Sequence, residues 1–283
     1  MKKAITGTAA VLAASCYLSA CSHNATNPAP VTQPALKTVS SPLLHVDGLT
    51  FKDLDHNGVL DTYEDWRLSP QARTRDLVQR MNLEEKIGLM LHSTAPYVAT
   101  GADAGYNLAK LTPLIGDKHI NHFISRLSID PTAMVASYNQ LQGLAEQTRL
   151  GIPISFSTDP RNHFQYTLGA SVSSGSFSQW PETLGLAATG DEKLVQRFGD
   201  IARQEYRSMG IQIALSPQAD LATEPRWSRI NGTFGEDVDL VSKMTAAYIV
   251  GFQHGSDGLQ PDGVAATVKH WAGYGAATKA WTR

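Results

Sequence analysis

V-A-A-T-V-K-H-W-A-G-Y, residues Val264 to Tyr274, is the stretch that decides the fold of this chain. Five small or β-branched residues, Val264–Val268, run directly into Lys269 and His270. Such a run predicts a buried parallel strand that carries a cation and an imidazole at its carboxyl end. In α/β barrels that end of the strands is where ligands bind. The stretch therefore predicts both a parallel sheet and a polar site at its edge.

Strand-like and helix-like segments alternate upstream of this stretch. The expected strands are 119–125, 153–156, 211–215 and 264–268, and the expected helices are 70–91, 131–148, 187–209 and 240–254. Residues 93–116 are expected to form a loop. Alternation of this kind implies a parallel sheet with crossover helices, and hence an α/β fold.

The composition is that of a globular enzyme large enough to bury one sizeable core. The chain has 283 residues, 42% of them hydrophobic and 18% charged, and its formal net charge is -2. The absence of a basic excess argues against a nucleic-acid partner. The two cysteines, Cys16 and Cys21, both lie near the N-terminus, so the body of the chain contains no disulfide and no thiolate metal cluster.

The N-terminus predicts export and a lipid anchor. Residues 1–20 combine two lysines with an alanine-rich apolar run, which is typical of a signal peptide. Leu18-Ser19-Ala20-Cys21 is similar to a bacterial lipobox, and the alternative is an ordinary signal followed by a chance cysteine. We expect Cys21 to be lipidated, residues 21–42 to form a flexible tether, and the folded part to begin at Leu43. This places the protein in a bacterial cell envelope, as a periplasmic or outer-membrane lipoprotein, or outside the cell, with membrane contact only through the anchor.

A calcium-loop pattern follows the tether. D-L-D-H-N-G-V-L-D-T-Y-E, Asp53 to Glu64, matches the template D-x-[DN]-x-[DN]-G-x5-E. A helix is expected at 63–68, but no helical period precedes the loop, so we predict a structural Ca²⁺ loop rather than an EF-hand sensor. A solvated acidic turn is the alternative. The expected ligands are oxygens of Asp53, Asp55, Asn57, Val59, Asp61 and Glu64.

Polar residues also follow two earlier strand-like runs. Asp159 follows the run 151–156, where it could accept hydrogen bonds from vicinal hydroxyls or cap the next helix, and this segment by itself favours the cap. Arg226 and Arg229 come after the run 211–215. We expect Arg226 to form an ion pair with Glu236 or Asp237, and Arg229 to reach a ligand.

The pair Lys269 and His270, which follows the strand-like run 264–268, has two chemical interpretations. A Lys-His pair beside an Asp and an Arg indicates a hydrogen-bonding cradle for a polyhydroxylated ligand. The alternative is a Schiff base formed by Lys269. The remaining histidines lack a metal-ligand spacing, so no catalytic zinc is predicted.

Five segments together resemble glycoside hydrolase family 3, the β-glucosidase family, from about Leu43 to Gly275. They are Glu85-Lys86-Ile87-Gly88, Gly151-Ile152-Pro153 with Thr158-Asp159, Pro225-Arg226-Trp227-Ser228-Arg229, Gly235-Glu236-Asp237 and Lys269-His270-Trp271-Ala272-Gly273-Tyr274-Gly275. The resemblance implies a TIM-like (β/α)8 barrel, incomplete at the C-terminus because about five of eight βα units are present.

The resemblance also implies residue roles. Asp159, Arg229, Lys269 and His270 would hold the sugar in the first subsite, and Tyr274 favours the glucosidase branch over the N-acetylglucosaminidases. The family's retaining mechanism needs a nucleophilic Asp and a general acid. In the family these lie in a Ser-Asp-Trp-like segment downstream and in a later domain, and this chain contains neither.

The resulting expectation is a truncated member of the family. The parent would hydrolyse terminal β-linked glucose of oligosaccharides without a required cofactor, and the 283 residues would be inactive and unstable alone. A non-catalytic surface lipoprotein that binds calcium or glycans is the alternative. The carboxylates within range of the strand ends, none of them in the family context of a nucleophile, are Glu182, Asp220 and Glu224.

Overall fold

The computed structural model describes residues 32–101, 103–167, 171–270 and 274–275. The chain divides into two compact units, Met1–Pro34 and Ala35–Arg283, and every element below belongs to the second. The predicted signal peptide and the lipidated Cys21 lie outside the described residues. Across the described ranges, no helix has both the length and the apolar character required to cross a membrane.

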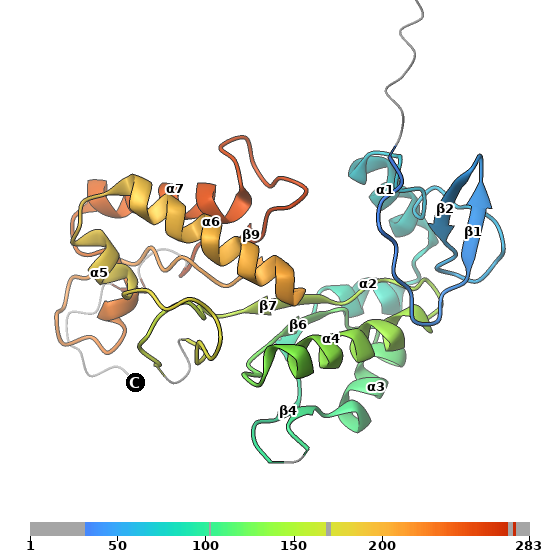
Figure 1. Cartoon of the computed structure of the whole chain (residues 1–283), viewed down its shortest axis with the longest axis horizontal. Coiled ribbons are helices and arrows are strands. Elements are labelled where there is room, and N and C mark those ends of the chain that lie inside the picture. Colours follow the sequence, from blue (N-terminus) through green and yellow to red (C-terminus); the bar gives the residue numbers. More distant parts are fainter. Residues whose placement is uncertain (1–31, 102, 168–170, 271–273, 276–283) are drawn as a thin grey trace, which may run out of the picture. The chain divides into compact units, whose positions relative to one another are not determined.

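A five-stranded, wholly parallel sheet forms the centre of this unit (Figure 1). The strands pair in the order in which they occur along the chain, so each new strand joins the same growing edge. This confirms the α/β prediction, although β6, β8 and β9 are shorter than expected and β3 was not predicted. The strands are β3 (His92–Thr94), β6 (His122–Ile124), β7 (Ser155–Thr158), β8 (Ile213–Ala214) and β9 (Ala265–Ala266).

Helices connect the successive strands, as parallel pairing requires. The connecting helices are α3 (Leu108–Gly116), α4 (Pro131–Glu146), α5 (Thr183–Ala187), α6 (Glu192–Met209), the 3-10 helix η1 (Ile230–Gly232) and α7 (Val238–Gln253). Asp130, Asp191 and Asp237 precede the three long ones and accept hydrogen bonds from their first-turn amides. After α6, Gly210 adopts a left-handed conformation (φ 79°), which lets the chain turn directly into the next strand.

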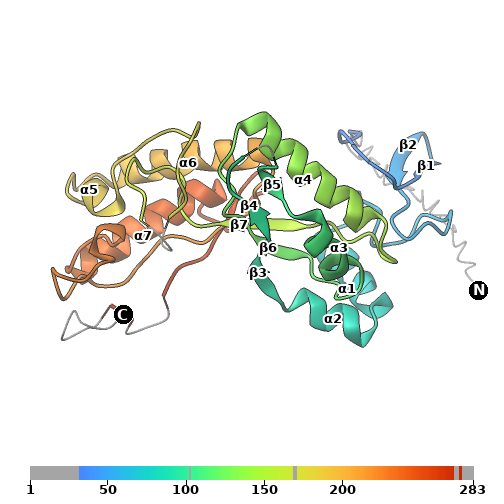
Figure 2. The same cartoon turned by 90° about the horizontal axis from the view of Figure 1, so that it is seen from below.

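The hydrophobic core lies between the sheet and these helices. Phe123 and Phe156 are register partners on β6 and β7, and both are fully buried. Helices α6 and α7 lie side by side in both views (Figures 1 and 2). Gly199 and Gly251 permit this, because a Cβ at either position would collide with backbone atoms of the facing helix.

The region before the sheet contains a hairpin and two helices. Strands β1 (Leu43–Val46) and β2 (Leu49–Lys52) pair antiparallel, and α1 (Pro70–Arg80) and α2 (Leu83–Leu89) follow. The helix expected over 70–91 is thus two helices. The capping signal at Asn82 is a complete capping box with Glu85, and it begins α2.

Two predictions for this region were wrong. Residues 93–116 do not form a loop: they contain the last two residues of the sheet strand β3, the short hairpin β4 (Tyr97–Val98) and β5 (Gly105–Tyr106), and then α3, whose helical signal was obscured by the internal Pro113. Residues 63–68 form turns rather than a helix. There the Glu64 carboxylate accepts hydrogen bonds from the amides of Leu54 and Asp61. These contacts close the loop 53–64, and the chain does not form the hydrogen bonds of a helix.

Ordered contacts extend into the segment predicted as tether. The Glu146 carboxylate, at the end of α4, accepts hydrogen bonds from the backbone amides of Val39 and Ser40 (2.7 Å each) and of Ser41 (3.2 Å). Its other oxygen binds Lys52 Nζ at 2.9 Å. The folded part therefore starts before Leu43, because the buried Glu146 carboxylate accepts hydrogen bonds from three successive backbone amides of the predicted tether.

Candidate functional site

The carboxyl ends of the parallel strands bring charged side chains to one edge of the sheet. Arg126 lies two residues beyond β6, Asp159 follows β7, and Lys269 and His270 come after β9. In a parallel sheet all these ends point in the same direction, so residues far apart in sequence meet there. The predicted convergence of strand ends is the arrangement found.

Asp159 is the centre of this edge. Its side chain is only 5% exposed, and it lies between two cations: Lys269 Nζ is 2.7 Å from Oδ1, and Arg126 Nη2 is 2.9 Å from Oδ2. Among the described residues the next helix begins at Thr183, and Asp159 caps none, so the helix-capping interpretation of Asp159 was wrong. A carboxylate and two ammonium or guanidinium groups offer both acceptors and donors to a neutral polar ligand.

Backbone pairing beyond the regular strands positions Lys269. The Lys269 amide donates to the Pro217 carbonyl at 3.0 Å, and the Ala219 amide donates to the Lys269 carbonyl at 2.6 Å. The lysine side chain then reaches across the β8 segment to Asp159, which follows β7. The nitrogen of Lys269 is engaged by the Asp159 carboxylate and is not free to attack a carbonyl carbon, which argues against the Schiff-base alternative.

His270 is oriented by a second buried carboxylate. Its Nδ1 lies 2.8 Å from Oδ2 of Asp220, whose side chain is 2% exposed. The imidazole ring also packs against Tyr274, with ring centroids 4.2 Å apart. Since Nδ1–H donates to Asp220, Nε2 is the ring atom without a hydrogen-bond partner among the described residues.

Arg229 makes only long contacts. Its Nη1 is 3.5 Å from the Tyr274 hydroxyl and its Nη2 is 3.5 Å from Oε1 of Gln218, while the buried Nε has no partner in the described part of the chain. A guanidinium with loosely engaged donors is suited to binding a ligand. Arg226 instead pairs with Glu224 at 2.8 Å, so its predicted pairing with Glu236 or Asp237 was wrong.

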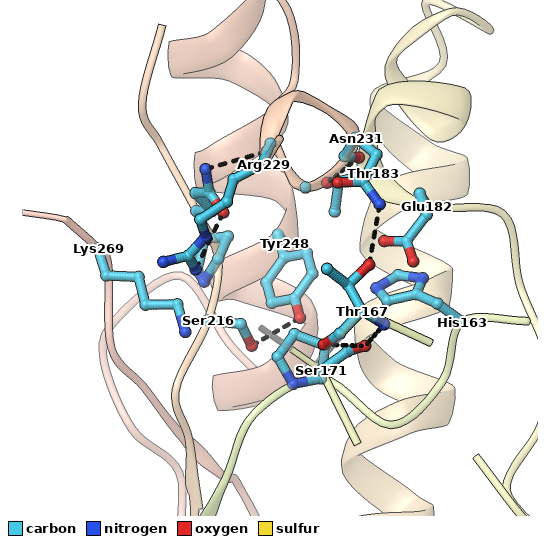
Figure 3. A pocket seen from close by; sticks show the side chains of 14 residues that line it. His163, Thr167, Ser171, Glu182, Thr183, Ser216, Arg229, Asn231, Tyr248 and Lys269 are labelled. Carbon is cyan, nitrogen blue, oxygen red and sulfur yellow. Dashed lines mark hydrogen bonds between the residues drawn. The ribbon is translucent and has the colours of Figure 1, made fainter. Parts of the chain in front are cut away.

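A small cavity adjoins this edge. Its volume is about 30 Å³, and Lys269 and Arg229 line one side (Figure 3). Glu182 lines another side, with its Oε1 buried and without a partner among the described residues. Burial raises the pKa of this carboxyl to about 7. Burial likewise lowers the pKa of the neighbouring His163 to about 4, so that imidazole supplies no positive charge at neutral pH.

The structure thus brings the four predicted residues to one edge and adds two that the sequence interpretation missed. Arg126 and Asp220 hold Asp159 and His270, respectively. Arg126 could have been found, because it directly follows the expected strand 119–125 and the strand-end rule applies there too. Asp220 stood within range of the strand ends, but nothing in the sequence pattern pairs it with His270.

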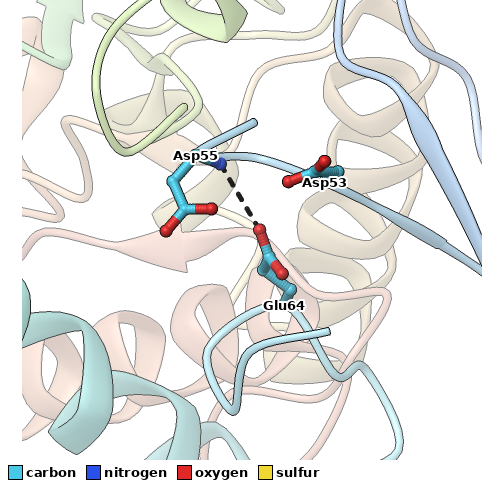
Figure 4. Close-up of side chains that lie close together, drawn as sticks. All are labelled: Asp53, Asp55 and Glu64. Carbon is cyan, nitrogen blue, oxygen red and sulfur yellow. Dashed lines mark hydrogen bonds between the residues drawn. The ribbon is translucent and has the colours of Figure 1, made fainter. Parts of the chain in front are cut away.

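The predicted calcium loop brings together three of its six expected ligands. Oxygens of Asp53, Asp55 and Glu64 all lie within 4.8 Å of one another (Figure 4). Burial, followed by the charge of nearby carboxylates, raises the pKa of Asp55, and burial raises that of Glu64. These shifts show that the charged forms are disfavoured here, mainly by burial and in part by neighbouring carboxylates, and a divalent cation would relieve both effects.

The other three expected ligands have different contacts. Asp61 binds the Arg80 guanidinium through both oxygens, at 2.7 Å each. Asn57 Oδ1 accepts a hydrogen bond from the Val59 amide, so the side chain closes the turn. The donor set therefore fits a hard cation through Asp53, Asp55 and Glu64, although Arg80, which pairs with Asp61, also lies 3.8 Å from Oδ2 of Asp55.

A parallel α/β sheet with charged side chains gathered at the carboxyl ends of its strands defines a class, the α/β enzymes that bind ligands at that edge. The family follows from sequence comparison. Residues 83–280 match the model of the glycosyl hydrolase family 3 N-terminal domain, and the chain belongs to this family of glycosidases.

Known proteins of the family include relatives more than twice as long as this chain. The chain is 58% identical, over 254 residues, to a periplasmic β-glucosidase/β-xylosidase of Dickeya chrysanthemi, a match that covers 89% of this chain and 39% of that protein. It is 43% identical over 224 residues to β-glucosidase C of Emericella nidulans, which covers 79% of this chain and 36% of that protein. The chain thus spans less than half the length of these relatives.

Solved structures of β-glucosidases share the fold. One from Erythrobacter marinus superposes with a TM-score of 0.61 at 26% identity, covering 78% of this chain and 28% of that one. A β-glucosidase from Listeria innocua in complex with glucose gives a TM-score of 0.56 at 26% identity, covering 74% of this chain and 28% of that one.

Proposed function

We propose that this chain supplies the sugar-binding half of a β-glucosidase active site, in which Asp159, Arg229, Lys269 and His270 hold a terminal β-linked glucose. The observation that carries the proposal is the buried Asp159 carboxylate between Lys269 and Arg126. The five parallel strands follow one another in the sheet in the same order as in the sequence. This order supports a (β/α)8 barrel, of which these strands would be the first part.

The site's chemistry fits a polyhydroxylated ring. Asp159 can accept hydrogen bonds from two vicinal hydroxyls, while Lys269 and Arg229 donate to the oxygens of the same groups. Each of these is a charge-assisted hydrogen bond, so the site favours a neutral ligand dense in hydroxyls. His270, oriented by Asp220, adds one further contact through Nε2.

We further propose that hydrolysis needs groups from outside the 283 residues. A retaining glycosidase requires one carboxylate free to attack and a second free to donate a proton, about 5–5.5 Å apart. Asp159 is held by two cations and Asp220 by His270, so neither is available for these roles. The chain is expected to bind sugar without cleaving a glycosidic bond.

The experiment is titration calorimetry of the 283-residue chain with D-glucose, beside an assay with an aryl β-glucoside. We expect saturable binding of glucose and no release of the aryl alcohol above the rate in buffer. Absence of glucose binding would overturn the proposed sugar site. Clear turnover by the purified chain would instead overturn the assignment of the nucleophile and acid to other sequence.

We propose a location in the bacterial cell envelope, with a lipid on Cys21 as the membrane contact. The support is the signal-like sequence at residues 1–20 and the fact that the Dickeya chrysanthemi relative is named as periplasmic. Metabolic labelling of the chain with a fatty acid, compared with the Cys21→Ser variant, tests the anchor.

We also propose that a structural Ca²⁺ binds Asp53, Asp55 and Glu64. At a Ca²⁺ concentration ten times the dissociation constant, linkage raises the free energy of unfolding by about 1.4 kcal/mol. Melting curves with millimolar Ca²⁺ and with EDTA should differ by roughly 4 °C. Asp55→Asn should abolish the difference, whereas Asp257→Asn, at an exposed position, should preserve it. Equal melting temperatures in Ca²⁺ and EDTA would contradict the site.

A further inference from the structure

The cavity beside the proposed sugar site has two chemically different sides. Lys269 and Arg229 form the side at the strand ends (Figure 3). Glu182 and His163 lie on the opposite side, with Tyr248 between the two (Figure 3). The cavity therefore opens next to the groups that would hold the ring hydroxyls, and its far side presents a carboxyl group.

We propose that this cavity receives the exocyclic hydroxymethyl group of a hexose and that Glu182 binds its hydroxyl, which makes Glu182 a residue that distinguishes glucosides from xylosides. The inference rests on the proposed function and specifies the sugar that the site prefers. A glucosyl and a xylosyl ring differ only in this group, and the Dickeya chrysanthemi relative is named for both activities.

The size of the cavity matches the group. A water molecule requires about 10–15 Å³ of such space, so a volume of about 30 Å³ holds about two non-hydrogen atoms. A hydroxymethyl branch has two, one carbon and one oxygen. A sugar ring is far larger than the cavity, so only a small substituent on a ring held at Asp159 and Lys269 can enter it.

The chemistry of Glu182 also fits a hydroxyl partner. Its buried Oε1 has no partner in the described part of the chain, and a buried polar atom of this kind is unfavourable until it is hydrogen-bonded. No described cation pairs with Glu182, and His163 donates from Nδ1 to the Pro181 carbonyl instead. Because burial raises the pKa of the carboxyl, it can either accept from or donate to a sugar hydroxyl near neutral pH.

The test compares three sugars by titration calorimetry of the 283-residue chain: D-glucose, D-xylose and 6-deoxy-D-glucose. The chain should bind glucose about tenfold more tightly than either of the others, the effect of one hydrogen bond to a carboxyl group. Glu182→Leu should reduce glucose affinity to the level of xylose and leave xylose affinity unchanged. Glu182→Gln, which keeps hydrogen-bonding atoms, should retain part of the preference.

Glu192→Gln, at an exposed position on α6, is the matched control and should leave all three affinities unchanged. Thermal unfolding of each variant shows whether the fold is intact. Equal binding of glucose and xylose by the unmodified chain, or parallel loss of both sugars in Glu182→Leu, overturns this inference while the sugar site stands. Failure of the unmodified chain to bind any of the sugars overturns the proposed function and this inference together.

Discussion

Replacing Asp159 with alanine is expected to raise the dissociation constant of the chain for D-glucose about a hundredfold, the equivalent of roughly 2.7 kcal/mol. Two effects combine. The ligand loses two charge-assisted hydrogen bonds, and Lys269 and Arg126 lose the carboxylate that orients both of them. Without Asp159 the two cations repel each other and turn toward solvent, so the remaining donors are no longer held in place. Titration calorimetry measures the change.

Two further variants separate loss of binding from loss of folding. Asp257→Ala removes an exposed carboxylate and should leave glucose affinity unchanged. Arg126→Ala removes only one of the two cations, so it should weaken binding by less than Asp159→Ala does. Circular dichroism melts report whether each variant is folded at the temperature of the titration. An Asp159→Ala chain that is folded and binds glucose normally would exclude Asp159 from the site.

Four of the five strands of the sheet were predictable because their signals are local, whereas β3 was missed. The run Val264–Val268 marks a strand within five residues, and the structure has β9 at that place. The prediction of a loop at residues 93–116 was wrong for a physical reason. Its two hairpin strands have two residues each, too few for a period to appear, and Pro113 interrupts the helical pattern of α3.

The candidate site was predictable where a residue's position in the chain fixes its position in space. Asp159, Lys269 and His270 end strands, and parallel strands place their ends together. Their partners depend on side-chain direction, which sequence spacing does not reveal. Lys269 pairs with Asp159 across an intervening strand, and Asp220 reaches His270 from a loop.

In the calcium loop, too, the positions of the residues were predictable from the sequence but their side-chain partners were not. The template fixes the oxygens contributed by residues within 12 positions, and three of the carboxylates do cluster. Arg80, which binds Asp61, comes from the end of α1 and lies outside the template. A sequence motif therefore cannot indicate that a neighbouring helix supplies a competing cation to two of the expected ligands, Asp61 and Asp55.

Glu146→Gln is expected to lower the free energy of unfolding at pH 7 by about 3 kcal/mol. Burial would raise the pKa of Glu146, but the amide hydrogen bonds from Ser40, Val39 and Ser41 and the contact with Lys52 hold it at about 2, well below its ordinary value of 4.5. The glutamine side chain carries no charge, so the variant loses the stabilisation that the folded state gains from the charged Glu146 carboxylate. The variant should also melt roughly 10 °C lower.

The pH dependence distinguishes this electrostatic effect from a simple packing defect. The pKa of Glu146 is lower in the folded state than in the unfolded state, so its stabilising contribution is complete above about pH 4.5 and is lost as the pH falls toward 2. Unfolding curves at pH 7 and pH 3 should therefore show a difference between the chain and Glu146→Gln that shrinks at the lower pH. Glu84→Gln, at an exposed position, should match the unmodified chain at both. A deficit of equal size at both pH values would mean that the side chain stabilises the N-terminal segment through packing and not through its charge.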